Sequence, residues 1–91
     1  MKFTIIPDDK TVIVDGLGYS DLEFTIDAKI HAVQWYGEIG EIEYKSEMTA
    51  NGVTKPNNLI ITKYSAFRGA LDAWETAKQA EVSDDNWFNR Q

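Results

Sequence analysis

Residues 30–45 of the chain read Ile30-His31-Ala32-Val33-Gln34-Trp35-Tyr36-Gly37-Glu38-Ile39-Gly40-Glu41-Ile42-Glu43-Tyr44-Lys45. Apolar and polar residues alternate in both halves of this stretch, and glycines lie at the join, which is typical of a β-hairpin. We predict that Gly37 pairs with Gly40. In that register Trp35 lies opposite Ile42, and the apolar side chains meet on one face. Because an isolated hairpin is only marginally stable in water, this one is expected at the centre of a larger sheet.

A second hairpin is predicted near the start of the chain. Phe3-Thr4-Ile5-Ile6 and Thr11-Val12-Ile13-Val14 flank a Pro-Asp-Asp-Lys segment with the composition of a turn. The register that follows from this turn pairs Phe3 with Val14 on one face. Isoleucines alternate with threonines on the other face, so we expect some cover over both faces of the sheet.

The segments between these hairpins and the last third of the chain are harder to interpret. Residues 15–18 predict a turn, and the alternation of apolar and polar residues over 22–26 suggests a third strand. Residues 47–58 contain Asn-Gly and Lys-Pro-Asn-Asn sequences, which predict an exposed, mobile loop. The apolar residues 59–61 fit an edge strand or an extended lead-in to the next element.

The last predicted element is an amphipathic helix over about residues 64 to 81, which Thr62 or Ser65 can cap. Its apolar residues recur at spacings of three and four and are Phe67, Ala70, Leu71, Trp74 and Ala77. This stripe is a natural cover for an apolar sheet face. We therefore predict an α+β fold, in which an antiparallel β-sheet of about four to five strands, a hairpin-rich meander, packs against one C-terminal α-helix.

The chain length of 91 residues indicates one domain. We assign residues 1–82 to a single α+β domain and residues 83–91 to a C-terminal tail. Tyr36 lies off the inward face of the central hairpin, and Trp87 and Phe88 form an apolar pair in a polar tail. These three residues are the candidate interface residues. The alternative for Trp87 is that it folds back on its own domain.

The charge and composition exclude several classes of function. A net charge of −6 disfavours binding to nucleic acid and to anionic membrane surfaces. No apolar run approaches the roughly 20 residues that span a bilayer. The chain has no cysteine, which excludes disulfides and a thiol nucleophile. We expect no nucleic-acid or membrane partner, whereas a basic protein partner is permitted and oligomerisation is left open.

The residues that carry chemistry do not form a recognisable set. His31 is the sole histidine, so neither a usual zinc site nor a catalytic triad is visible. Glu38, Glu41, Glu43 and Glu47 cluster near the hairpin, and we interpret them as a solvated face rather than as a general acid–base pair or a calcium site. We therefore predict no catalytic residue, no cofactor and no metal site, and hence no enzyme.

One resemblance spans most of the chain. The residues that carry it are Phe3-Thr4-Ile5-Ile6-Pro7, Val14-Asp15-Gly16, Ile30-His31-Ala32-Val33-Gln34-Trp35-Tyr36-Gly37, Gly40-Glu41-Ile42-Glu43-Tyr44 and Leu71-Asp72-Ala73-Trp74-Glu75. In these segments the chain resembles a group of small proteins encoded by tailed bacteriophages and prophages. The His-Ala-Val-Gln-Trp-Tyr-Gly run is the most specific part. The chain departs from the group's pattern between Leu22 and Lys29.

The genes of this group often lie near tail-fibre genes, and the group supplies no catalytic residues. The resemblance therefore implies a non-enzymatic phage protein that acts by protein–protein contact. Such a protein would be a minor tail or tail-fibre-associated virion component, or a tail assembly factor, with a phage tail or tail-fibre protein as its partner. The alternative is a small acidic inhibitor that binds a basic host protein during infection. These hypotheses place the protein in the virion or in the host bacterial cytoplasm.

Overall fold

A computed structural model describes the backbone of residues 1–89 and the side chains of residues 1–81. The strands are β1 (Phe3–Ile6), β2 (Thr11–Val14), β3 (Leu17–Tyr19), β4 (Ile30–Trp35), β5 (Gly40–Tyr44), β6 (Glu47–Thr49), β7 (Gly52–Thr54) and β8 (Leu59–Ile61). The helical elements are the 3₁₀ turns η1 (Pro7–Asp9) and η2 (Ser65–Phe67) and the α-helix α1 (Arg68–Asn89). The predicted α+β class is therefore confirmed.

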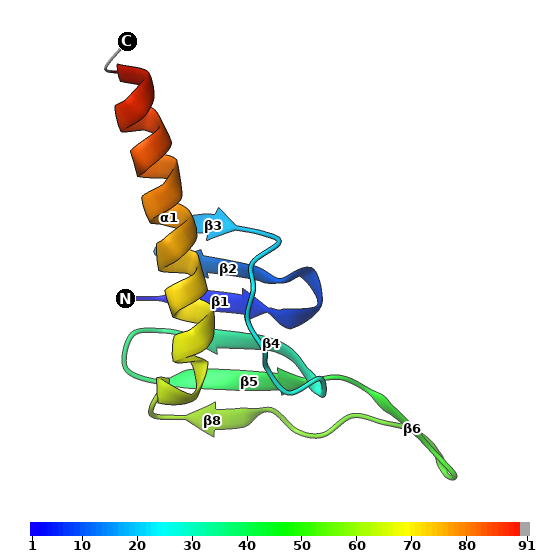
Figure 1. The fold of residues 1–91 in the computed structure, drawn as a ribbon. Helices are drawn as coiled ribbons and strands as arrows, with labels where there is room; N and C mark the ends of the chain where they lie inside the picture. The colour runs from blue at the N-terminus through cyan, green and yellow to red at the C-terminus, as the bar shows by residue number, and fades with distance from the viewer. Residues whose placement is uncertain (90–91) are drawn as a thin grey trace.

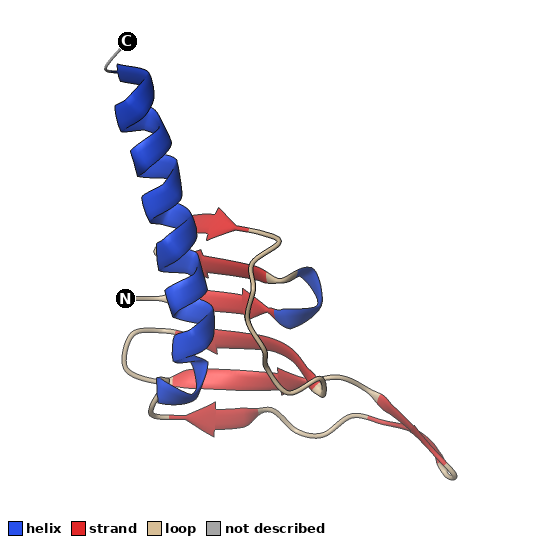
Figure 2. Cartoon of the chain, in the orientation of Figure 1, coloured by secondary structure: helices blue, strands red, loops and turns tan. Residues whose placement is uncertain are grey.

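The main sheet has six strands in the order β3-β2-β1-β4-β5-β8, and all neighbouring strands are antiparallel (Figure 1). We expected about four to five strands, and β3 is the strand that the sequence did not indicate. Strands β6 and β7 form a separate two-stranded sheet that projects away from the body of the molecule (Figure 2). This hairpin occupies the segment predicted as an exposed loop, and its residues are all exposed.

The N-terminal hairpin has the predicted register. Phe3 pairs with Val14, and Ile6 pairs with Thr11 across the η1 turn. Lys10 closes this turn in the left-handed conformation, with φ of 49°, and its backbone N–H donates to the carbonyl of Pro7.

The central hairpin forms where it was predicted, but its predicted register is wrong by two residues. Trp35 pairs with Gly40 instead of with Ile42, and Ile42 pairs with Val33. The reason is the size of the indole, because a Cβ atom on Gly40 would lie 2.6 Å from Cε3 of Trp35. Only glycine allows this close approach. Since a shift of two residues keeps every side chain on its own face, Trp35 and Ile42 are both buried as predicted.

The strand suggested over residues 22–26 does not form. Residues 20–29 instead cross the molecule as coil, beside the helix on the covered face of the sheet (Figure 1). The backbone N–H of Leu22 donates to the carbonyl of Lys10 at 3.0 Å, and the Lys10 ammonium donates to the carbonyl of Phe24 at 2.6 Å. Leu22, Phe24 and Ile26 are half-buried against the core, so their alternation reflects a covering segment and not a paired strand.

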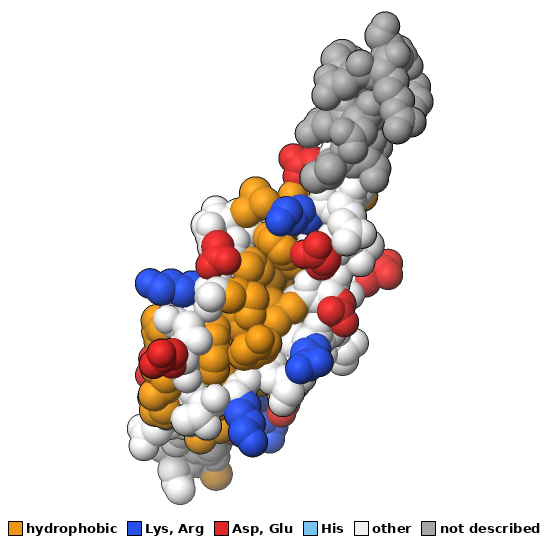
Figure 3. All heavy atoms as spheres, turned by 90° about the vertical axis from the view of Figure 1, so that its left-hand side faces the viewer, with side chains coloured by type: hydrophobic (Ala, Val, Ile, Leu, Met, Phe, Trp, Pro, Cys, Tyr) orange, Lys and Arg blue, Asp and Glu red, His pale blue; other side chains and the backbone are white. Residues whose placement is uncertain are grey.

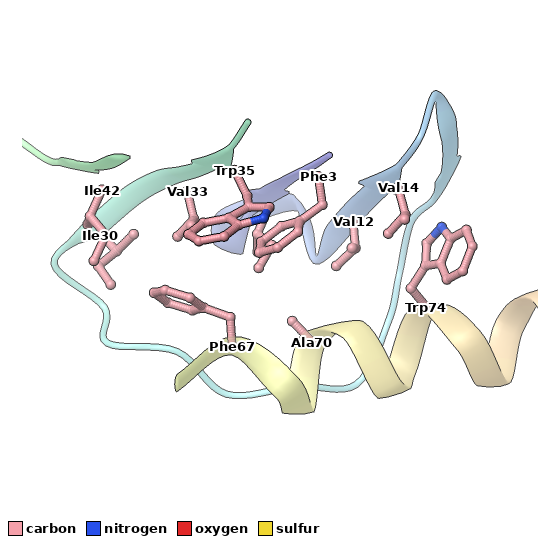
Figure 4. Packing of buried hydrophobic residues seen from close by; sticks show 11 residues of the cluster. Phe3, Val12, Val14, Ile30, Val33, Trp35, Ile42, Phe67, Ala70 and Trp74 are labelled. Carbon is pink, nitrogen blue, oxygen red and sulfur yellow. The ribbon is translucent and has the colours of Figure 1, made fainter. Parts of the chain in front are cut away.

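Helix α1 lies across one face of the sheet with the predicted apolar stripe inward (Figure 4). Phe67, Ala70 and Trp74 are buried in one cluster with side chains from β1, β2, β4 and β5. The Nε1–H of Trp74 donates to the carbonyl of Leu17 at 2.8 Å, which ties the helix to β3. The expected cap is absent, because the N-cap position of η2 is Tyr64 and its side chain makes no capping hydrogen bond.

We expected some cover over both faces of the sheet. In the described residues, however, no element covers the face opposite helix α1. Ile6 and Ile13 lie on the face opposite the helix, are only half-buried and do not belong to the core cluster. Thr4 and Gln34 lie on the same face, where the Thr4 hydroxyl donates to Oε1 of Gln34 at 2.6 Å. The sheet therefore has one apolar, covered face and one mixed, open face.

Replacing Trp35 by alanine tests the centre of this core. Trp35 is 5% exposed, and we expect Trp35→Ala to lower the free energy of unfolding by about 3–5 kcal/mol, measured by urea denaturation. The neighbouring aromatic residue is the matched control, because Tyr36 is 53% exposed and Tyr36→Ala is expected to change stability by less than about 1 kcal/mol. Equal losses in both variants would contradict the assigned faces.

Two glycines test the contact between Trp35 and β5. At Gly40 a Cβ atom would also lie 2.7 Å from the carbonyl oxygen of Gln34, so Gly40→Ala is expected to destabilise the fold by about 1–3 kcal/mol. At Gly69, in the first turn of α1, a Cβ atom would meet nothing within 4 Å. Gly69→Ala is therefore expected to stabilise the fold by about 0.5–1 kcal/mol. Thermal unfolding of both variants measures the contrast, and a neutral Gly40→Ala would show that the strand shifts freely.

Candidate functional site

Exposed apolar side chains gather at the end of the sheet where the chain begins and where the β4–β5 turn lies. We call this surface the apolar end and define it by Met1, Leu17, Tyr36 and Ile39, which are 50%, 44%, 53% and 46% exposed. Figure 3 views the molecule from this end and shows hydrophobic side chains gathered over the middle of this face. Exposed apolar patches of this kind often mark interaction sites.

The strand register explains why these residues come together. Val14 pairs with Leu17 at the end of β2, and Phe3 pairs with both Val14 and Trp35. Trp35 in turn pairs with Gly40, so the β2–β3 and β4–β5 turns and the N-terminus all lie at one end of the sheet. The apolar end is therefore a product of strand pairing between distant parts of the chain.

The β4–β5 turn presents two members of the apolar end. The backbone N–H of Tyr36 donates to the carbonyl of Ile39 at 2.8 Å, and Gly37 supplies a φ of 114°, which favours glycine. Tyr36 follows the buried Trp35 and so projects to the other side of the sheet. The turn is closed by this hydrogen bond, and the side chains of Tyr36 and Ile39 both lie outside the buried core.

Two hollows flank Trp35 at this end. The hollow of about 220 Å³ includes Tyr36, Thr4 and Gln34 on the open face of the sheet. The hollow of about 300 Å³ includes Trp35 and Tyr64 on the covered face. The rings of Trp35 and Tyr64 meet edge to face, with centroids 5.1 Å apart. Both hollows are open and shallow, which suits side chains of a partner protein.

Basic residues line these hollows although the chain as a whole is acidic. Lys2 borders the first hollow, and Lys63 and Arg68 border the second. Figure 3 shows blue and red side chains placed around the apolar area rather than within it. An apolar centre with a charged rim is the arrangement found in many protein–protein interfaces.

The single histidine lies far from this end of β4. His31 is exposed and occupies the irregular point of the β4–β5 ladder, where the register shifts between Ile30 and Ala32. One additional residue at such a bulge is left out of the pairing. Nothing in the described part of the chain brings a second titratable group into a hydrogen bond with His31.

The clustered glutamates make separate contacts on the open side of β5. Glu41 accepts a hydrogen bond from the Asn58 side chain at 3.0 Å, and Glu43 forms an ion pair with Lys55 at 3.2 Å. Glu38 and Glu47 are exposed at the turn and on β6. These contacts leave the four carboxylates spread along the surface instead of sharing one site.

A third hollow, of about 540 Å³, lies between α1 and the coil of residues 20–29. Its walls include Asp21, Glu23 and Asp72. Over the part of the chain that the structure describes, however, no three histidine, cysteine or acidic residues lie close enough together to hold a metal ion.

The predicted interface residues have different outcomes. Tyr36 is exposed and lies at the apolar end, whereas the side chains of Trp87 and Phe88 lie outside the described residues. Sequence reasoning missed Leu17 and Ile39. The available signal was an apolar residue in each predicted turn, next to glycine, where a core residue is not expected.

Comparison of the chain with models of known protein families, with curated proteins and with solved structures finds no match. No helix in the described residues has the length and apolar character needed to cross a membrane.

Proposed function

We propose that this protein acts without catalysis, by protein–protein contact, as a minor tail or tail-fibre-associated component of a tailed phage or as a tail assembly factor. The phage setting rests on the sequence resemblance described above. The binding surface is the apolar end, and Tyr36 is its central anchor. The partner is a phage tail or tail-fibre protein.

The observation that carries this proposal is the exposure of Tyr36 beside Ile39 on a turn with its own closing hydrogen bond. Tyrosine has a large apolar ring and a polar hydroxyl, and it is enriched among the residues that dominate binding energy. A rigid turn binds with less loss of conformational entropy than a flexible one. The surrounding hollows offer room for side chains of the partner.

A second candidate function is a host-directed inhibitor that binds a basic host protein. The net charge of −6 favours it, since an acidic protein attracts a basic partner over long range. The apolar end, with Lys2, Lys63 and Arg68 at its hollows, is not the surface for such a partner. An inhibitor would use the carboxylates of the open face, and its binding would weaken strongly with added salt.

The first test is binding of the purified protein to purified tail and tail-fibre proteins by isothermal titration calorimetry. Tyr36→Ala is expected to weaken binding by about tenfold or more, because loss of a central aromatic anchor costs at least about 2 kcal/mol. His31→Ala is the matched control, since His31 is exposed on the same β4 hairpin but lies away from the apolar end. The His31→Ala variant is expected to bind these proteins with the same affinity as the wild type.

Two results would contradict the proposal. One is absence of the protein from virions together with no binding to any tail protein. The other is binding to a tail protein that Tyr36→Ala leaves unchanged. Salt-sensitive binding of a basic host protein, lost on neutralising Glu41 and Glu43, would favour the inhibitor instead.

A further inference from the structure

The hollow on the covered face differs in charge from the rest of this acidic chain. Its lining consists of two aromatic residues, two hydroxyl residues and two basic residues, which are Trp35, Tyr64, Thr62, Ser65, Lys63 and Arg68. We call it the basic hollow. Every polar side chain in its lining carries a hydrogen-bond donor, and none carries a negative charge.

The two cations of the basic hollow are not neutralised within the part of the chain that the structure describes. Lys45 and Lys55 form ion pairs with carboxylates elsewhere, whereas the side chains of Lys63 and Arg68 make no hydrogen bond or ion pair with any described residue. Neither η2 nor the first turn of α1 contains an acidic residue. Asp72, one turn after Arg68, lines the separate hollow beside residues 20–29. Two uncompensated cations at one hollow favour an external negative charge.

The donors of the basic hollow suit a carboxylate. A guanidinium such as that of Arg68 presents N–H groups in a planar fork that matches the two oxygens of a carboxylate, and the Lys63 ammonium adds a compact positive charge. The hydroxyls of Thr62 and Ser65 make no hydrogen bond within the described residues, so they are available to the same group. Together these side chains satisfy both oxygens of one carboxylate.

The aromatic residues favour a carboxylate that is attached to an apolar body. The half-buried Tyr64 packs edge to face on Trp35, with centroids 5.1 Å apart, and on Phe3, at 5.8 Å. These contacts hold its ring beside the two cations. A hollow of about 300 Å³ lies at the lower end of the volumes found for ligand sites, so it admits one side chain and its neighbour rather than a large ligand.

We propose that the basic hollow binds an acidic side chain of the partner protein, which enters between Lys63 and Arg68 while an apolar neighbour packs on Tyr64. Only the identity of the partner as a tail or tail-fibre protein rests on the proposed function. Charge complementarity selects this occupant, since the net charge of −6 repels a polyanion such as nucleic acid. A single acidic residue in an apolar segment meets the local positive charge and the adjoining apolar end. Such a contact fixes the orientation of the partner on the surface.

NMR titration of the isotope-labelled chain with benzoate tests the site without any partner protein. Benzoate combines a carboxylate with an aromatic ring, and benzamide is its uncharged analogue of similar shape. We expect benzoate to shift the backbone amide signals of residues 62–68 and to bind at least about fivefold more tightly than benzamide. Equal shifts from both compounds, or a larger response to inorganic phosphate, would overturn the proposal.

Three charge-matched variants locate the carboxylate. Lys63→Gln and Arg68→Gln are each expected to remove most of the preference for benzoate over benzamide. Lys29→Gln is the control, because Lys29 is exposed just before β4, at the end of that strand opposite to Trp35. All three variants lose one positive charge, so an equal effect in all three would indicate general electrostatics and would overturn the site. Circular dichroism checks that each variant folds.

The same variants separate this inference from the proposed function when binding to tail proteins is measured by calorimetry. We expect Arg68→Gln to weaken that binding by about fivefold or more and Lys29→Gln to leave it within about twofold of the wild type. Binding that Tyr36→Ala weakens but Lys63→Gln and Arg68→Gln do not would overturn the carboxylate site and leave the proposed function standing. Selective benzoate binding without affinity for any tail protein would support the site and contradict the proposed function.

Discussion

The contact between the indole of Trp35 and the backbone of Gly40 sets the geometry on which the rest of the structure depends. The side chain of Trp35 occupies the space that a side chain on its cross-strand neighbour would need. This contact fixes the register of the central hairpin and makes residues 36–39 the turn. On the covered face, Trp35 stacks near Phe3 at 6.2 Å and meets Tyr64 edge to face. One residue thereby links the first strand, the central hairpin and the segment that leads into the helix.

Much of the fold follows from residue patterns that are local in sequence. The register of the N-terminal hairpin follows from alternation and from a turn of fixed length, and the buried stripe of α1 follows from apolar spacing. The central register was predicted wrongly because both glycines were assigned to the turn, whereas Gly40 belongs to β5. Strand β3 was missed because Leu17-Gly18-Tyr19 carries little strand signal. It forms because β2 has a free edge and because Trp74 holds its first carbonyl.

The candidate site was less accessible from the sequence than the fold. Tyr36 was found by elimination, since it follows an inward tryptophan and must project to the other side. Met1, Leu17 and Ile39 come from three separate segments, and only the pairing of β1 with β2 and β4 brings those segments to one end. A local pattern does not contain that information. The charged residues illustrate the same limit, because Lys63 and Arg68 lie beside Trp35 only after the helix has packed.

The unequal protection of the two sheet edges follows from using a single helix to cover a six-stranded sheet. Helix α1 begins near β5 and continues past β3 (Figure 1). It therefore covers β3 at one edge of the sheet and does not cover β8 at the other edge. Two open edges would permit continued head-to-tail growth of the sheet, which leads to filaments. In the described residues helix α1 contacts β3, where Trp74 donates to the carbonyl of Leu17, whereas β8 pairs only with β5. The helix that buries the core therefore also protects one edge of the sheet from pairing with another strand.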